Sequence, residues 1–109
     1  MLLAAWQRRQ APERSLRWLD LMAGCGIRAL RWGLEAASAK TGPLELWVND
    51  ADADRRALLH ANLAPLNGGG GGPEALLVEQ RSLPAEVLLR QAYLEQRSFD
   101  LIDPTSKAA

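Results

Sequence analysis

The sequence predicts an α/β fold of the Rossmann-like type, in three α/β/α layers with about four parallel strands. Two observations carry this prediction. Short apolar segments typical of strands alternate with longer segments of helical periodicity, which favours a parallel sheet with helices on its faces. The turn "AGCG" at residues 23–26 follows the first strand, where such folds hold nucleotide-like ligands. At 109 residues the chain is expected to form a single domain.

The first third of the chain predicts a helix, a strand and a second helix. Residues 2–9 have an amphipathic pattern that Pro12 interrupts, and residues 16–22 alternate as a strand does. A helix is predicted from Ile27 until "KTGP" at 40–43 ends it. The residues expected to line its core-facing side are Ile27, Leu30, Leu34 and Ala37.

The middle of the chain predicts a second strand at 44–50 and a helix over 53–66. Either of two aspartates, Asp52 or Asp54, can cap this helix. Its apolar stripe is expected to consist of Leu59, Leu63 and Leu66. The glycine-rich segment 67–73 is predicted to be a flexible loop.

The last third of the chain predicts a strand, a helix and a final strand. Residues 75–80 read as the third strand, and 98–103 as the fourth. Between them a helix is expected to run to about Gln96, with Pro84 in its first turn.

Composition excludes several kinds of site and gives no support to others. Thirteen basic and thirteen acidic residues cancel, so there is no basic excess of the kind that nucleic-acid binders usually show. One cysteine and one histidine can form neither an internal disulfide nor a metal-ligand cluster. Apolar runs are too short to cross a bilayer, and no signal peptide is apparent, so we expect no membrane partner and a cytoplasmic location.

The glycine turn has features that separate two ligand classes. Asp20 precedes Gly24 and Gly26 in the pattern D-x-x-x-G-x-G, and the second predicted strand ends at Asp50. An acidic side chain at that position can accept two hydrogen bonds from a ribose diol. Together these features fit S-adenosylmethionine better than a dinucleotide, since this cofactor has a ribose but no pyrophosphate. Two alternatives stay open: a tight turn without a ligand, and Asp50 as a cap of the following helix.

Three segments resemble the tRNA (guanine-26-N2)-dimethyltransferase family: "LDLMAGCGIRALRWGLEA", "VNDADADRRALLHANL" and "FDLID". The resemblance runs from about Leu16 to Asp103, and its most specific parts are Gly26–Arg31 and Asn49–Asp52. It implies a class I methyltransferase that uses S-adenosylmethionine to methylate the exocyclic amine of a guanine, with tRNA as partner.

The resemblance also implies roles for residues of the cofactor site. The segment from Asp20 to Gly26 would form the methionine-side wall of the pocket; within it we single out Asp20, Ala23, Gly24, Cys25 and Gly26. Asp50 would bind the ribose hydroxyls, and Ala51 would lie at the adenine edge. After the third strand the family supplies an acidic contact to the adenine amine, whereas this chain has "EQRSLP" there.

The C-terminal segment departs from the family pattern. The family's D-x-D-P-F-G segment holds the target guanine, and this chain has "FDLIDPTSKAA". Asp103 and Pro104 are therefore the candidate catalytic residues, with Asp103 matching either the first or the second aspartate. Residues 1–109 are expected to be a partial methyltransferase domain, the cofactor-binding half, with little or no activity alone. The alternative is a degenerate, non-catalytic cofactor-binding module or a truncated reading frame.

Overall fold

The computed structural model describes Gln7 and residues 16–39, 44–68 and 76–104. Four strands form one sheet in the order β3-β2-β1-β4, and every neighbouring pair is parallel. They are β1 (Leu16–Asp20), β2 (Leu44–Asn49), β3 (Leu76–Arg81) and β4 (Leu101–Asp103). The predicted α/β class and the number of strands are confirmed.

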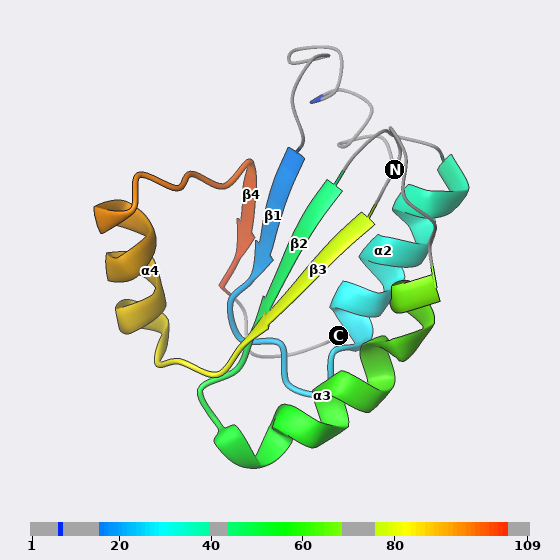
Figure 1. Ribbon diagram of the computed structural model, residues 1–109, viewed down its shortest axis with the longest axis horizontal. Coiled ribbons are helices and arrows are strands. Elements are labelled where there is room, and N and C mark those ends of the chain that lie inside the picture. Colours follow the sequence, from blue (N-terminus) through cyan, green and yellow to red (C-terminus); the bar gives the residue numbers. More distant parts are fainter. Residues whose placement is uncertain (1–6, 8–15, 40–43, 69–75, 105–109) are drawn as a thin grey trace.

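In the described ranges, the helices α2, α3 and α4 cover the two faces of the sheet, as Figure 1 shows. α2 (Ile27–Ala39) and α3 (Arg56–Leu63) lie on one face, and α4 (Ala85–Leu94) lies on the other. Short 3₁₀ helices, η1 (Ala53–Arg55) and η2 (Ala64–Gly68), extend α3 at its two ends. The described residues thus form the three-layer α/β/α arrangement that the sequence predicts.

The strand order creates a switch point between β1 and β4. From β1 the chain moves outward through β2 to β3, then returns to add β4 on the other side of β1. The connection that leaves β1 leads to α2 on one face of the sheet, and the connection that leaves β3 leads to α4 on the other, as Figure 1 shows. In open parallel sheets, ligands bind in the crevice that such a divergence opens at the carboxyl ends of the strands.

Helices pack against both faces of the central strands β1 and β2, so these two strands are largely apolar on both sides. Trp18, Leu46 and Val48 belong to a large core with buried residues of α2 and α3. Leu19 and Trp47 point to the opposite face and pack with Leu88 of α4 in a smaller core. Trp47 lies edge-to-face with Phe99, their ring centroids 5.4 Å apart.

The predicted core face of α2 is confirmed at Leu30, which packs against the core, and is wrong at Ile27 and Leu34. Ile27 and Leu34 are 51% and 49% exposed, and the buried residues of the helix are Ala29, Gly33 and Ala36. The cause is a close approach of helices, because a Cβ on Gly33 would lie 2.7 Å from side-chain carbons of Leu66. The small residues therefore face inward and the larger ones flank the contact; Ala37 lies among the residues whose side chains are not described.

The apolar stripe of the next helix is confirmed, since Leu59, Leu63 and Leu66 are all buried. The continuous helix expected over 53–66 is instead divided, and α3 ends at Leu63. Pro65 explains this end, because proline has no N–H to donate and restricts the residue before it. Asn67 and Gly68, predicted as loop, belong to η2, and the remainder of the 67–73 loop lies outside the described residues.

Several other element ends differ from prediction by a few residues. β1 ends at Asp20 and β2 at Asn49, each before the predicted end, and β4 begins only at Leu101. Pro84 is the residue before α4 rather than part of its first turn, and its carbonyl accepts from Leu88 N–H. Of the helix predicted at 2–9, only Gln7 is described, and it is helical.

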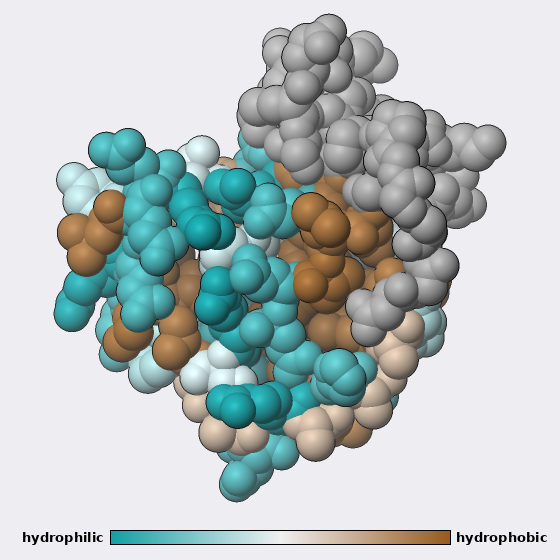
Figure 2. All heavy atoms as spheres, viewed as in Figure 1, coloured by the Kyte–Doolittle hydropathy of each residue, from teal (hydrophilic) through white to brown (hydrophobic). Residues whose placement is uncertain are grey.

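The surface is mixed in polarity, with hydrophobic side chains exposed over α4 and near the middle of the view in Figure 2. On α4 these include Leu89 and Leu94, and the aromatic Tyr93 is also exposed.

None of the helices in the described ranges has the length and apolar character that a bilayer crossing requires.

Candidate functional site

The carboxyl edge of the sheet brings together most of the residues that the sequence singled out. Asp20 ends β1, and the register of the parallel pair sets it opposite Asp103 at the end of β4. On the other side of β1, Asn49 ends β2 and Asp50 follows it. The glycine turn at 23–26 leaves β1 at this same edge, before α2 begins.

The glycine turn needs glycine at two positions. Gly24 and Gly26 have φ values of 62° and 88°, a region that L-residues with a side chain rarely adopt. At Gly26 space is also lacking, because an added Cβ would lie 2.8 Å from Cδ2 of the buried Leu59. The Gly26 carbonyl accepts from Leu30 N–H at 2.9 Å and so begins the hydrogen-bonding of α2.

Asp50 ties this turn to the end of β2. Its Oδ2 accepts a hydrogen bond from the Gly24 N–H at 2.8 Å, and its Oδ1 accepts from the Asp52 N–H at 2.9 Å. Asp52, not Asp50, caps the following helical segment, since its side chain accepts from the Asp54 N–H at 3.0 Å. The interpretation of Asp50 as a helix cap is therefore wrong, and the carboxylate lies against the turn.

Asp20 is the most unusual group at this edge, because it is a fully buried carboxyl. Its Oδ1 lies 3.4 Å from a guanidinium nitrogen of Arg28, while Oδ2 is buried without a hydrogen-bond partner in the described part of the chain. The same Arg28 nitrogen lies 3.2 Å from Asp103 Oδ1. Burial raises the pKa of Asp20 to about 6; Arg28 opposes the rise, and the charges of Asp103 and Asp50 add to it.

Two residues of this site were missed by the sequence analysis. Arg28 lies at the start of α2 and bridges the carboxylates of β1 and β4. Asn49 is fully buried and bonds the loops that follow β1 and β3. A signal was available for each: Arg28 follows the glycine turn by two positions, and Asn49 is the polar end of the apolar strand "LELWVN".

The remaining predicted residues lie at the same edge with different exposure. Ala23 is buried and its N–H donates to the Asn49 carbonyl at 2.8 Å. Cys25 is partly buried with a free thiol, and its carbonyl accepts from Asn62 of α3 at 2.8 Å. Ala51 and Pro104 are exposed.

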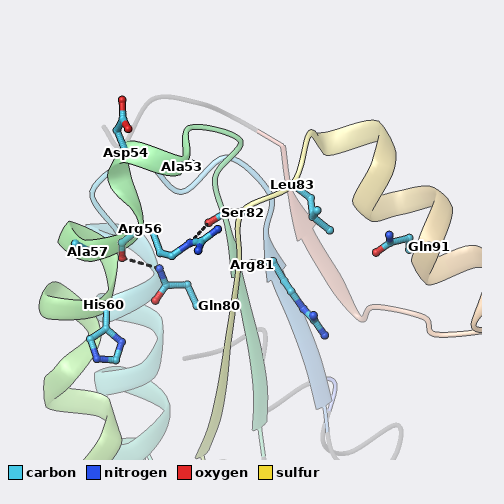
Figure 3. A pocket seen from close by; sticks show the side chains of 10 residues that line it. All are labelled: Ala53, Asp54, Arg56, Ala57, His60, Gln80, Arg81, Ser82, Leu83 and Gln91. Atoms are coloured by element: carbon cyan, nitrogen blue, oxygen red, sulfur yellow. Dashed lines mark hydrogen bonds between the residues drawn. The ribbon is translucent and has the colours of Figure 1, made fainter.

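A shallow pocket of about 1040 Å³ lies beside the end of β3, away from the switch point. Figure 3 shows its lining from η1, α3, β3 and α4, with the Arg56 side chain directed toward Ser82. Arg56 Nε lies 3.3 Å from Ser82 Oγ, and Gln80 Nε2 donates to the Arg56 carbonyl at 2.9 Å. His60 lines this pocket and not the glycine turn.

Comparison of the chain with models of known protein families, with curated proteins and with solved structures gives no match. Within the described ranges, no group of three or more His, Cys, Asp or Glu side chains is arranged to hold a metal ion.

Proposed function

We propose that the carboxyl edge of this sheet binds S-adenosylmethionine, in a methyltransferase-like domain of the tRNA guanine-N2 dimethyltransferase type. The observation that carries the proposal is the buried Asp20 carboxyl, whose Oδ2 has no hydrogen-bond partner among the described residues. Burying a charge without enough partners is unfavourable, and a cationic ligand beside it would relieve the penalty.

Charge at the site favours this ligand over a dinucleotide. Asp50 and Asp103 both act on the pKa of Asp20, so three carboxyl groups lie near one another and one guanidinium, Arg28, lies among them. S-adenosylmethionine has a cationic sulfonium and an ammonium group at its methionine end. A dinucleotide would bring the negative pyrophosphate to the same carboxylates, where it would be repelled.

The turn and Asp50 have the chemistry to hold the nucleoside part. Gly24 has no side chain of its own, so a ligand can approach the backbone of the turn closely at this position. Asp50 already accepts from Gly24 N–H, and its oxygens keep further lone pairs for the ribose hydroxyls. Ala51, exposed next to it, leaves room for a base.

Methyl transfer is a separate question from binding. Bound S-adenosylmethionine would supply an electrophilic methyl group on its sulfonium, which a guanine amine attacks. Asp103 is the residue in this chain that would accept or orient the amine proton, and it is paired with Arg28 at 3.2 Å. After Pro104 the sequence has Thr105 and Ser106 where the family has an aromatic residue and glycine. We therefore expect weak cofactor binding and no methylation of tRNA by this chain.

A non-catalytic cofactor-binding module is the second candidate, and the pairing of Asp103 with Arg28 favours it. Incubation with tRNA and cofactor labelled in its methyl group separates the two functions. Label in guanine would show an active enzyme, whereas binding without label would indicate the module.

Calorimetric titration with S-adenosylmethionine and, separately, NAD tests the ligand class. We expect measurable heat with the first ligand and none with the second, and loss of binding in Asp50→Ala. Asp54→Ala is the matched control, because Asp54 is an exposed aspartate of the same acidic run. Absence of heat with S-adenosylmethionine at millimolar concentration, or equal binding of both ligands, would contradict the proposal.

A further inference from the structure

The side chain of Asn49 connects two loops at the carboxyl edge of the sheet. Its Nδ2 donates to the Leu21 carbonyl at 3.0 Å and to the Leu83 carbonyl at 2.9 Å. Its Oδ1 accepts from the Leu83 N–H at 3.0 Å. Leu21 opens the loop that contains the glycine turn, and Leu83 lies in the loop between β3 and α4.

The backbone of Asn49 adds a fourth bond to the same connection. Its carbonyl accepts from the Ala23 N–H at 2.8 Å, so the glycine turn is held by both the main chain and the side chain of one residue. Asn49 is fully buried, and water therefore cannot replace these bonds if they are lost. The residue next to it, Asp50, binds Gly24 from the same strand end.

Only a primary amide of this length makes all three side-chain bonds. Two carbonyls need a donor with two hydrogens, and the Leu83 N–H needs an acceptor; asparagine offers both from one planar group. An aspartate in the same place would keep the acceptor but turn an oxygen toward two carbonyl oxygens. A leucine of similar size would leave all three backbone groups unpaired.

We propose that Asn49 is a positioning residue of the cofactor site, which sets the separation between the glycine turn and the loop after β3. The inference rests on the proposed function, in which the glycine turn lies against the ligand, so a shift of the turn relative to the loop after β3 would change the shape of the site. Asn49 acts through Leu21, Ala23 and Leu83, and its own side chain is occupied by the loops.

The test compares Asn49→Ala and Asn49→Asp with a control of reduced stability that leaves the loops unchanged. Ala92→Gly is suitable, because Ala92 is buried on α4 near its far end from the carboxyl edge. For each variant we would measure unfolding by urea, affinity for S-adenosylmethionine by calorimetry, and amide shifts of Ala23 and Leu83 by NMR. Binding is measured under conditions of temperature and buffer in which circular dichroism shows that each variant is fully folded.

We expect both Asn49 variants to bind about tenfold or more weakly than wild type, while Ala92→Gly stays within about twofold. We also expect the Ala23 and Leu83 amides to shift together in both Asn49 variants. Wild-type affinity in Asn49→Ala, or an equal loss in Ala92→Gly, would overturn the positioning role. If wild type binds no ligand, the proposed function fails. The connection between the two loops is tested separately by the amide shifts, and it is refuted if Ala23 and Leu83 do not shift in the Asn49 variants.

Discussion

Replacing Asp20 with asparagine should change how the stability of the protein depends on pH. The Asp20 carboxyl is fully buried, and burial raises its pKa to about 6 against 3.8 for the ordinary group. The folded chain therefore holds the Asp20 proton more tightly than the unfolded chain does. This contribution to stability is present below about pH 4 and is lost as the pH rises to about 6.

The size of the effect follows from the pKa difference. Each unit of difference between the folded and unfolded chain corresponds to about 1.4 kcal/mol. A rise from 3.8 to about 6 thus corresponds to about 3 kcal/mol lost between low and neutral pH. In Asp20→Asn this loss is absent, because an amide does not titrate, and Arg28 keeps its contact with Asp103.

The assay is urea unfolding of wild type and Asp20→Asn at several values between about pH 4 and pH 7. As pH rises, the free energy of unfolding of Asp20→Asn should increase relative to that of wild type, by up to about 3 kcal/mol. Glu35→Gln, which removes an exposed carboxylate from α2, is the control and should keep the wild-type dependence. A difference between Asp20→Asn and wild type that stays constant with pH would refute the reasoning.

Three further predictions concern the turn, the core and the ligand. Gly26→Ala should lower the free energy of unfolding by about 1–3 kcal/mol, and by more than Gly24→Ala does. The reason is that only at Gly26 would the added Cβ meet a buried side chain, at 2.8 Å. Equal urea midpoints for the two variants would contradict this. Leu59→Ala should destabilise by about 2–5 kcal/mol, whereas Leu58→Ala, at a half-exposed position of the same helix, should stay within about 0.5 kcal/mol in thermal unfolding. Affinity for S-adenosylmethionine should fall as pH drops below about 6, since protonated Asp20 loses the charge that favours a cation; calorimetry showing tighter binding at low pH would oppose that role.

The fold could be predicted from the sequence because its signals are local and agree with one another. Alternating apolar segments indicate the strands, and Asp52, one of the two predicted caps, begins the helical segment before α3. The end of α3 before Pro65 was not predicted. The core face of α2 could not be predicted in the same way. Hydropathy favours Ile27 and Leu34 as core residues, but the close contact of Gly33 with Leu66 is set by tertiary packing.

The candidate site was predictable where a residue type has a conformational or chemical reason of its own. Gly24 and Gly26 adopt left-handed backbone angles that glycine permits, and Asp50 accepts a hydrogen bond from the N–H of Gly24. Arg28 and Asn49 were missed because their importance depends on partners far away in sequence, Asp103 and Leu83. Such partners meet only when β4 and the loop after β3 reach the same edge of the sheet.

The most direct test of the central claim is an NMR titration with S-adenosylmethionine, followed through the backbone amides of the labelled protein. We predict saturable shifts at the carboxyl edge, in Gly24, Gly26, Asp50 and Ala51, that disappear in Asp50→Ala and persist in Asp54→Ala. Shifts confined to the pocket beside β3, around Arg56 and Gln80, or no shifts at millimolar ligand, would contradict it.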